Sequence, residues 1–328
     1  MIAAPRAPAA AVLALVAGGA VAAPVLTPHR PEQQFAEFYA PPMPPRLRDA
    51  EGRWRRPFVY PVRLADRLAR RYEVDRSRPV PIRWFTNGTM ASIDERDGPW
   101  LPLGSDAVGR DVLARLLYGA RASLGVALVA AAAAMLLGAL TGALAGFAGG
   151  RLDYLLMAIA DFVLVLPAIY VALALRATMP LVLTATQVFC ILTAILAAAA
   201  WPFPARAVRA IVAAERGKEY AEAARAAGAR PSRILLRHLL PATRGFVVVQ
   251  GLLLLPSFIL AEVTLSYVGL GFPDPTASWG QMLREAGRGR AFADAPWLLA
   301  PAGVLVITIL ALHLTVDGRS RSETLPVR

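Results

Sequence analysis

Cysteine and lysine are almost absent from this chain of 328 residues. Cys190 is the only cysteine, which excludes an intrachain disulfide and a cysteine-based metal cluster. Lys218 is the only lysine, and Val212 stands where the first glycine of the phosphate-binding motif GxxxxGKS/T would have to be. The patterns HExxH and GxSxG are absent as well. The sequence therefore predicts no catalytic residue, no metal site and no ATP-binding loop, and the protein is not expected to be an enzyme.

Apolar residues, in contrast, make up 56% of the chain, and its mean hydropathy is +0.49. Both values are too high for an ordinary soluble protein of this size. The formal net charge is +12, but the arginines fall between apolar runs and do not gather on one face, so nucleic-acid binding is not expected. Part of the solvent around this protein must be lipid.

Six stretches are long and apolar enough, or nearly so, to cross a bilayer, which takes ~20 residues because the hydrocarbon layer is ~30 Å thick. They lie at 7–26, 123–147, 154–175, 180–201, 246–268 and 296–316. The second contains Gly138, Gly142 and Gly146, a spacing that lets a neighbouring helix backbone approach closely. The expected fold class is all-α, a polytopic transmembrane helical bundle of about six spans with an extracytoplasmic segment after the first.

The first apolar stretch has two interpretations. Arg6, the alanine-rich core and Val21-Ala22-Ala23 resemble a cleavable signal peptide, whereas the length of the stretch also fits an uncleaved anchor. We favour an N-terminal transmembrane anchor over 1–27. Either interpretation leaves the same five helices downstream.

The orientation follows from the segment 202–245, which carries nine basic residues against Glu215, Glu219 and Glu222. The positive-inside rule places such a segment in the cytoplasm. Six spans then put both termini in the cytoplasm, including a tail at 319–328, and leave 28–122 outside.

The outer segment divides into three parts. Residues 28–57 are punctuated by proline, which predicts an extended, hydrated connector, and residues 58–100 carry enough aromatic residues for a small folded cap. From Val108 to Leu124 apolar residues recur every four positions, while Arg110, Asp111, Arg115 and Arg121 fall mostly off this stripe. This pattern predicts an amphipathic helix on the outer membrane surface, or alternatively a surface helix packed on the cap.

The segment 219–241 predicts two short helices that project from the membrane. Strong helix formers fill 218–227, and Gly228 then ends the helix. A second helix is expected from Pro231 to near Pro241, since proline is tolerated in a first helical turn. The alanines offer a low-bulk surface that another protein could contact closely, although a polar loop lying on anionic lipid would have a similar composition.

Glu222-Ala223-Ala224, then Gly228, then Leu240-Pro241 resemble the EAA loop of ABC importer permeases. In that family the loop is the coupling helix that sits in a groove on the ATPase subunit. The resemblance implies that the coupling residues are Glu219, Glu222, Ala223, Ala224, Gly228, His238, Leu240 and Pro241. Histidine at position 238 resembles the oligopeptide, dipeptide and nickel subgroup.

Further segments resemble the C-type subunit of the same subgroup. They are Leu103 to Val112, then Arg115, Tyr118-Gly119 and Arg121, then Arg151, Asp153, Met157, Asp161 and Pro167, and finally Ser266 to Gly271 with Ser278-Trp279-Gly280 and Met282-Leu283. Two features depart from the subgroup: the outer segment is longer than usual, and the tail after Asp317-Gly318 is Arg-Ser-Arg-Ser. The resemblance implies a permease domain with a five-helix core at 123–318, in the bacterial inner membrane.

The resemblance also implies partners and a substrate class. The partners are a second permease subunit, two ATPase subunits that hold ATP and Mg²⁺, an extracytoplasmic solute-binding protein and membrane lipid, while the chain itself binds no cofactor. Peptides are the expected substrate, with nickel or another small solute as the alternative. A membrane-anchored sensor or assembly factor is the competing class, and a secondary transporter is less favoured because inverted repeats are not apparent.

Two carboxylates lie within predicted spans. Asp161 either faces the translocation path or makes a helix–helix hydrogen bond near the cytoplasmic end. Glu262 either lines a cavity or reaches the outer interface. Both are candidate residues of the translocation path.

Overall fold

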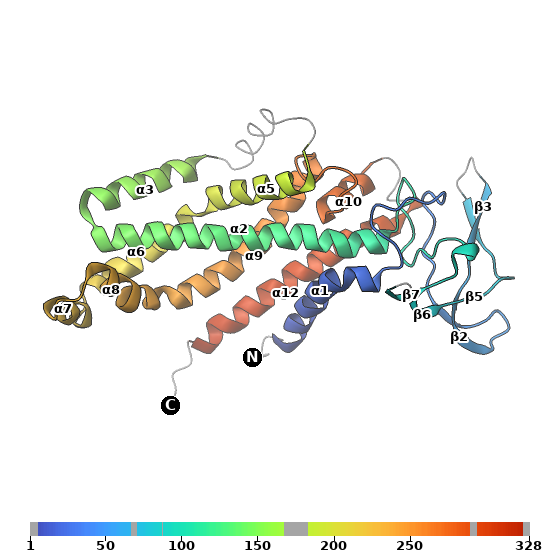
Figure 1. Ribbon diagram of the computed structural model, residues 1–328, viewed down its shortest axis with the longest axis horizontal. Helices are drawn as coiled ribbons and strands as arrows, with labels where there is room; N and C mark the ends of the chain where they lie inside the picture. Colours follow the sequence, from blue (N-terminus) through green and yellow to red (C-terminus); the bar gives the residue numbers. More distant parts are fainter. Residues whose placement is uncertain (1–5, 67–70, 87, 167–182, 289–293, 324–328) are drawn as a thin grey trace. The chain divides into compact units, whose positions relative to one another are not determined.

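A computed structural model describes residues 6–66, 71–86, 88–166, 183–288 and 294–323 (Figure 1). The described chain is mostly helical, with a small region of β-sheet after the first helix. The expectation of an all-α fold is therefore wrong for the segment between the first two long helices. Seven short strands occupy its described residues, and this segment also holds much of the charge of the chain.

The helices have the following bounds: α1 Arg6–Leu26, α2 Val112–Ala148, α3 Gly150–Val165, α5 Ala185–Ala200, α6 Pro202–Arg216, α7 Glu219–Ala226, α8 Pro231–Ile234, α9 Arg244–Val268, α10 Trp279–Ala286 and α12 Ala300–Glu323. A π-helical turn, η2 (Leu235–Leu239), and a 3-10 turn, η3 (Leu240–Thr243), join α8 to α9. Two more 3-10 turns are η1 (Glu95–Asp97) and η4 (Pro296–Leu299).

Four helical segments within the described chain are long and apolar enough to cross a membrane. They are Ala7–Leu26, Val112–Ala148, Pro231–Val268 and Pro296–Val316. Helices α5 and α6 meet at an angle of 44° and make a fifth candidate if the bent pair is one span. The described residues thus give four or five candidate spans where six were expected, because the predicted span 154–175 lies partly outside them and α3 has only 16 residues.

The sheet region is built from three small sheets. Strands β1 (Arg46–Arg48), β2 (Trp54–Val59) and β5 (Val80–Pro81) form one antiparallel sheet in the order β1-β2-β5. Strands β3 (Val62–Asp66) and β4 (Arg71–Val74) form a second, and β6 (Arg83–Thr86) and β7 (Thr89–Ser92) form a third. Phe58 pairs with Arg46 on one side of β2 and with Pro81 on the other, which sets the register of the three-stranded sheet.

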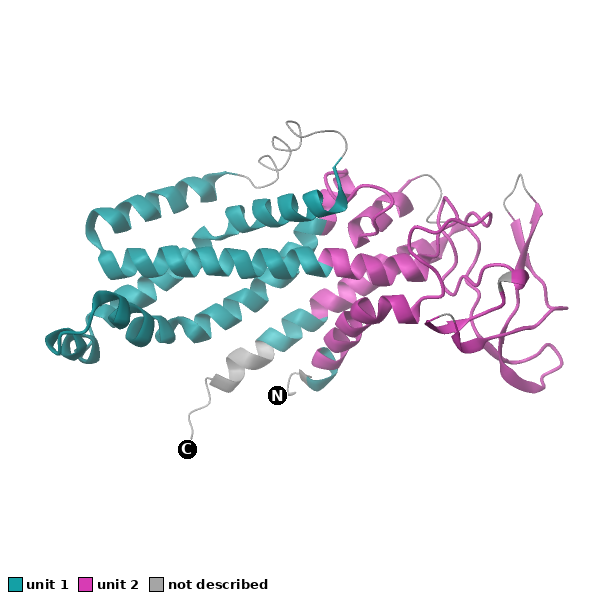
Figure 2. Ribbon diagram, viewed as in Figure 1, with its two compact units in different colours: residues 1–9, 124–262, 311–328 teal, residues 10–123, 263–310 magenta. Residues whose placement is uncertain are grey.

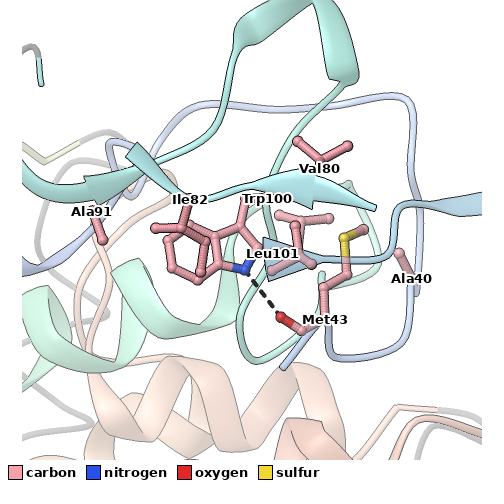
Figure 3. Packing of buried hydrophobic residues seen from close by; sticks show 8 residues of the cluster. Ala40, Met43, Val80, Ile82, Ala91, Trp100 and Leu101 are labelled. Carbon is pink, nitrogen blue, oxygen red and sulfur yellow. Dashed lines mark hydrogen bonds between the residues drawn. The ribbon is translucent and has the colours of Figure 1, made fainter. Parts of the chain in front are cut away.

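A hydrophobic cluster holds this cap together (Figure 3). Trp100 and Leu101 pack against Val59, Val80 and other buried residues. Met43 joins them from the proline-rich stretch: its amide donates to the Leu101 carbonyl at 3.0 Å, and Trp100 Nε1 donates to the Met43 carbonyl at 3.0 Å. The small folded cap is confirmed. The extended, hydrated connector predicted at 28–57 is only partly correct: most of it is exposed, but Ala40 and Met43 are buried in this cluster and β1 pairs with β2.

The chain forms two compact units, shown in different colours in Figure 2. One contains residues 1–9, 124–262 and 311–328, and the other contains residues 10–123 and 263–310. In the first unit the glycine spacing of α2 has the predicted effect. A Cβ on Gly142 would lie 2.2 Å from the Ala205 carbonyl oxygen, and one on Gly146 would lie 2.5 Å from the Arg209 carbonyl oxygen. Only glycine permits the backbones of α2 and α6 to approach so closely.

In the second unit α1 is fastened to the start of α2. Pro24 has no N–H to donate to the Ala20 carbonyl, and Arg121 supplies the missing donor, with Nε 2.5 Å from the Ala20 oxygen and Nη2 2.6 Å from the Val21 oxygen. Thr27 closes the end of the helix through its hydroxyl, 2.8 Å from the Ala23 carbonyl oxygen. Ala23 itself is fully buried.

The helix predicted from Val108 begins instead at Val112 and is continuous with the predicted second span, forming one helix of 37 residues. Arg110, Asp111 and Arg115 are not on a solvated face, since their exposed fractions are 2%, 0% and 0%. The amphipathic surface helix is therefore wrong. The arginines are buried because carboxylates from a distant loop pair with them, which sequence periodicity does not reveal.

Candidate functional site

Helix α7 ends in a Schellman motif at Gly228, as the sequence predicts. Gly228 has φ +76°, a conformation that glycine adopts without strain. Its amide donates to the Arg225 carbonyl at 2.9 Å, and the Ala229 amide donates to the Ala224 carbonyl at 3.0 Å. These bonds satisfy the last carbonyls of α7 and turn the chain sharply into α8.

The second helix does not end near Pro241. Helix α8 continues through η2 and η3 into α9, so that Pro231–Val268 is one helical segment. Pro241 has no N–H for the carbonyl four residues before it, and the wider π-turn at Leu235–Leu239 precedes this interruption. The second half of the segment 219–241 is thereby continuous with a candidate span, without an intervening loop.

One face of this segment is buried and the other is open. Ala221, Ile234 and Leu239 pack in a cluster with Ala143 of α2 and with Val208 and Val212 of α6, all within one unit. Of the predicted coupling residues, Glu219, Glu222, Ala223 and Gly228 are exposed, and Ala224, His238, Leu240 and Pro241 are half-buried. One face of the helix pair α7–α8 therefore packs on α2 and α6, and the opposite face is exposed.

Local polar contacts stiffen the start of α7. Glu215 accepts hydrogen bonds from Lys218 Nζ at 2.6 Å and from the Tyr220 hydroxyl at 2.5 Å. The bond to Glu215, with partial burial, raises the pKa of Tyr220 and keeps the phenol protonated. Arg225 Nη2 donates to the Arg216 carbonyl at 2.9 Å. These contacts hold α7 in a fixed position relative to the end of α6.

Asp161 is ion-paired with Arg206, and Asp153 is paired with Arg209 at 2.5 Å, both between α3 and α6. Arg206 and Arg209 lie in the segment 202–245, for which the sequence predicts a basic cytoplasmic loop, but they belong to helix α6. The pair formed by Asp161 favours the helix–helix alternative for this residue. An intramembrane carboxylate with a cationic partner is far less costly than one without.

Glu262 is fully buried in α9, six residues before the end of that helix at Val268. Its side chain reaches no open surface of this subunit. The structure does not bring it together with Asp161, which is 57% exposed on α3.

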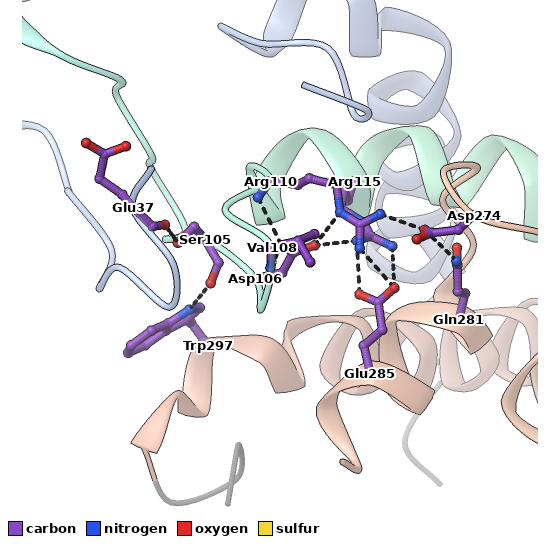
Figure 4. A network of polar contacts seen from close by, with 10 residues as sticks. All are labelled: Glu37, Ser105, Asp106, Val108, Arg110, Arg115, Asp274, Gln281, Glu285 and Trp297. Atoms are coloured by element: carbon purple, nitrogen blue, oxygen red, sulfur yellow. Dashed lines mark hydrogen bonds and ion pairs between the residues drawn. The ribbon is translucent and has the colours of Figure 1, made fainter. Parts of the chain in front are cut away.

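A buried ion network at the start of α2 escaped the sequence analysis (Figure 4). Arg110 contacts Asp106 at 2.7 Å, Asp274 at 2.6 Å and Glu285 at 3.1 Å. Arg115 contacts Asp106 and also reaches Glu285 at 2.9 Å. These carboxylates lie up to 175 residues away along the chain from the arginines. The network fastens the loop after α9, together with α10, to the segment that opens α2.

The network also shifts the pKa values of Asp274 and Arg110, which lie outside the candidate spans. Burial alone would raise the pKa of Asp274, but the hydrogen bond from Arg110 and the charges of Arg110 and Arg115 outweigh it, and the pKa lies below its ordinary value. Burial alone would lower the pKa of Arg110, but Asp106, Asp274 and Glu285 raise it. Both shifts favour the charged forms of Asp274 and Arg110.

Long apolar helices, with an exposed helix pair packed on two of them, are typical of a polytopic membrane protein. The family model described as the binding-protein-dependent transport system inner membrane component matches residues 134–318. This match covers more than half of the chain, and the chain belongs to that family. It is thus a multi-pass inner-membrane permease of a binding-protein-dependent ABC transporter and a non-catalytic subunit, which excludes the anchored sensor and the secondary transporter.

Individual relatives agree with this assignment. The chain is 36% identical over 216 residues to the oligopeptide transport system permease protein OppC of Bacillus subtilis, covering 66% of this chain and 68% of that protein. It is 36% identical over 242 residues to a protein of Brucella suis biovar 1 named as a peptide transport system permease, covering 72% and 78%. The expected resemblance to the peptide permeases is confirmed.

A solved structure shares the fold. A chain from the MetNI methionine ABC transporter in inward-facing conformations superposes with a TM-score of 0.51 and 22% sequence identity. The match covers 64% of this chain and 96% of that chain. At this identity the likeness concerns the fold alone.

Proposed function

We propose that this permease forms part of a translocation path for peptides and that the exposed face of 219–241 is the docking site of the ATPase subunit. The peptide assignment is carried by the relatives, which are named as peptide permeases at 36% identity over 66% and 72% of this chain. ATP and Mg²⁺ belong to the ATPase partner. The remaining partners are a second permease subunit, a second ATPase subunit and an extracytoplasmic solute-binding protein.

The geometry of the coupling segment supports the docking proposal. Ala223 and Ala224 offer a surface of low bulk beside the exposed carboxylate of Glu222, and Gly228 adds no side chain at the bend. A partner can approach such a surface closely. Ile234 and Leu239 are buried against α2 and α6 in the same unit. A displacement of the exposed face by a bound partner would therefore be transmitted directly to these helices.

The proposed topology keeps six spans, with both termini and 319–328 in the cytoplasm and the cap outside. Asp161 and Glu262 remain candidates for the translocation path, and the ion pair of Asp161 makes it the weaker of the two. Glu262 would have to face a path shared with the second permease subunit. Replacement of Glu262 by glutamine should then alter uptake of cationic peptides more than uptake of neutral ones.

Uptake by the reconstituted transporter tests the substrate class. The complete complex in proteoliposomes is supplied with its solute-binding protein and ATP, and a panel of di- to pentapeptides is compared with Ni²⁺ and a free amino acid. We expect ATP-dependent accumulation of peptides only. Accumulation of Ni²⁺ or of the amino acid without accumulation of peptides would contradict the peptide assignment. It would leave the assignment as a permease unchanged.

A further inference from the structure

A cavity of about 910 Å³ lies beside the end of α1, in the unit formed by residues 10–123 and 263–310. Pro24 and Thr27 line it from the end of α1, Tyr118 lines it from α2, and Trp100 lines it from the cap. The volume is in the range of pockets that hold small ligands. Peptide transport does not account for this cavity.

The charge of the cavity is positive. Arg30 lines it, and no aspartate or glutamate does so within the described residues. A turn places Arg30 next to Gln33, and the backbone N–H of Gln33 donates to the Arg30 carbonyl at 3.1 Å. Both side chains line the cavity. Neither side chain is hydrogen-bonded to any residue that the structure describes. Glu32 belongs to the same turn but not to the lining. A guanidinium and an amide with available donors suit an anion.

Part of the wall is aromatic, and several of its side chains are already held in place. His29 is held by its Nδ1, 3.0 Å from the buried carboxylate of Asp111, and its ring meets Phe35 at 4.6 Å between centroids. Trp100 is fixed by its hydrogen bond to Met43. Because these side chains are already ordered, a ligand would bind without a large cost in side-chain entropy.

The position of the cavity indicates which class of anion it binds. Helix α1 ends at Leu26, and both α1 and α2 are candidate membrane spans. Lipid headgroups lie at the ends of spans, where tyrosine and tryptophan are enriched and arginine side chains near helix ends reach the interface. We propose that the cavity binds the phosphate-bearing headgroup of an anionic phospholipid, with Arg30 and Gln33 on the phosphate and the aromatic wall on the glycerol.

Lipid retention by the intact transporter tests this site. The complex is placed in nanodiscs with equal amounts of phosphatidylglycerol and phosphatidylcholine, extracted with mild detergent, and examined by native mass spectrometry for bound lipid. We expect Arg30→Ala to lower phosphatidylglycerol retention about tenfold, since one charged hydrogen bond contributes about 1.5 kcal/mol. Arg30→Lys should keep most of the retention, and Glu32→Ala, in the same turn, should keep all of it.

Two results would overturn the proposal. One is equal phosphatidylglycerol retention by the wild type and Arg30→Ala. The other is Arg30-dependent binding of inorganic phosphate, measured by calorimetry, without retained lipid, which would assign the cavity to a soluble anion. Neither result bears on peptide uptake, so this site and the transport function fail independently.

Discussion

A buried cluster of ion pairs at the start of α2 depends on a few individual residues. Two arginines and three carboxylates, from segments far apart in the sequence, pair with one another in a largely buried cluster. Arg115 is fully buried and Asp106 nearly so, and each would be costly without the other. The cluster replaces the solvated face that the spacing of these residues suggests.

Replacing Arg115 by leucine should leave Asp106 and Glu285 short of a cation and destabilise the protein by about 3 kcal/mol. We expect the apparent Tm of the purified complex to fall by roughly 5 °C. Arg115→Lys should recover only part of this, because lysine lacks the planar fork that reaches both carboxylates. Arg56→Leu, at an exposed position on β2, is the matched control. Equal Tm values for the Arg115 and Arg56 variants would contradict a stabilising network.

The same cluster predicts a pH dependence. A carboxyl whose pKa is depressed in the folded protein stabilises it above its ordinary pKa of ~3.9, and the contribution is lost as the pH falls through the folded value. The apparent Tm should therefore stay level from pH 8 to pH 5 and fall below about pH 4. Asp274→Asn should lower the Tm at pH 7 and weaken the acid dependence. A drop between pH 7 and pH 5 that Asp274→Asn abolishes would contradict this account.

Among the structural elements, close helix packing was predictable and long-range pairing was not. The glycines of α2 revealed a tight helix contact because the cause lies in their own spacing, and Gly228 marked the end of α7 for the same reason. The strands at 46–92, the buried state of Arg110 and the continuous helix through Pro241 depend on partners far away in sequence. Local patterns carry no information on those partners.

The contact between α2 and α6 can be tested at Gly142. An alanine there places Cβ 2.2 Å from the Ala205 carbonyl oxygen, so the two helices must separate. Overpacking of this kind costs about 1–3 kcal/mol, and we expect a lower Tm and reduced ATP-dependent uptake. Gly303→Ala in α12 is the matched control, because no atom lies within 4 Å of its added Cβ. Unchanged stability of Gly142→Ala would disprove close packing.

For the whole molecule, the first question is whether α1 remains attached. A cleavage after Ala23 would remove the carbonyls that Arg121 contacts, and Ala23 is buried. We therefore expect intact-mass and N-terminal peptide analysis of the purified protein to find residues 1–27 as a retained anchor. A mature N-terminus at Pro24 would contradict this prediction and favour a signal peptide.

In the proposed transporter, the exposed face of 219–241 joins the permease to its ATPase. Gly228 and Gly52 both have positive φ, +76° and +78°, and no atom lies within 4 Å of a Cβ added to either. An aspartate at either position is tolerated to a similar degree by the fold, but at 228 it projects from the proposed docking face.

The most direct measurement is the amount of ATPase subunit that co-purifies with a tagged permease from membranes. We expect Gly228→Asp to lose most of the bound ATPase, together with ATP-dependent uptake, and Gly52→Asp to retain both at wild-type levels. Retention of the ATPase and full uptake by Gly228→Asp would contradict the assignment of this loop as the coupling site.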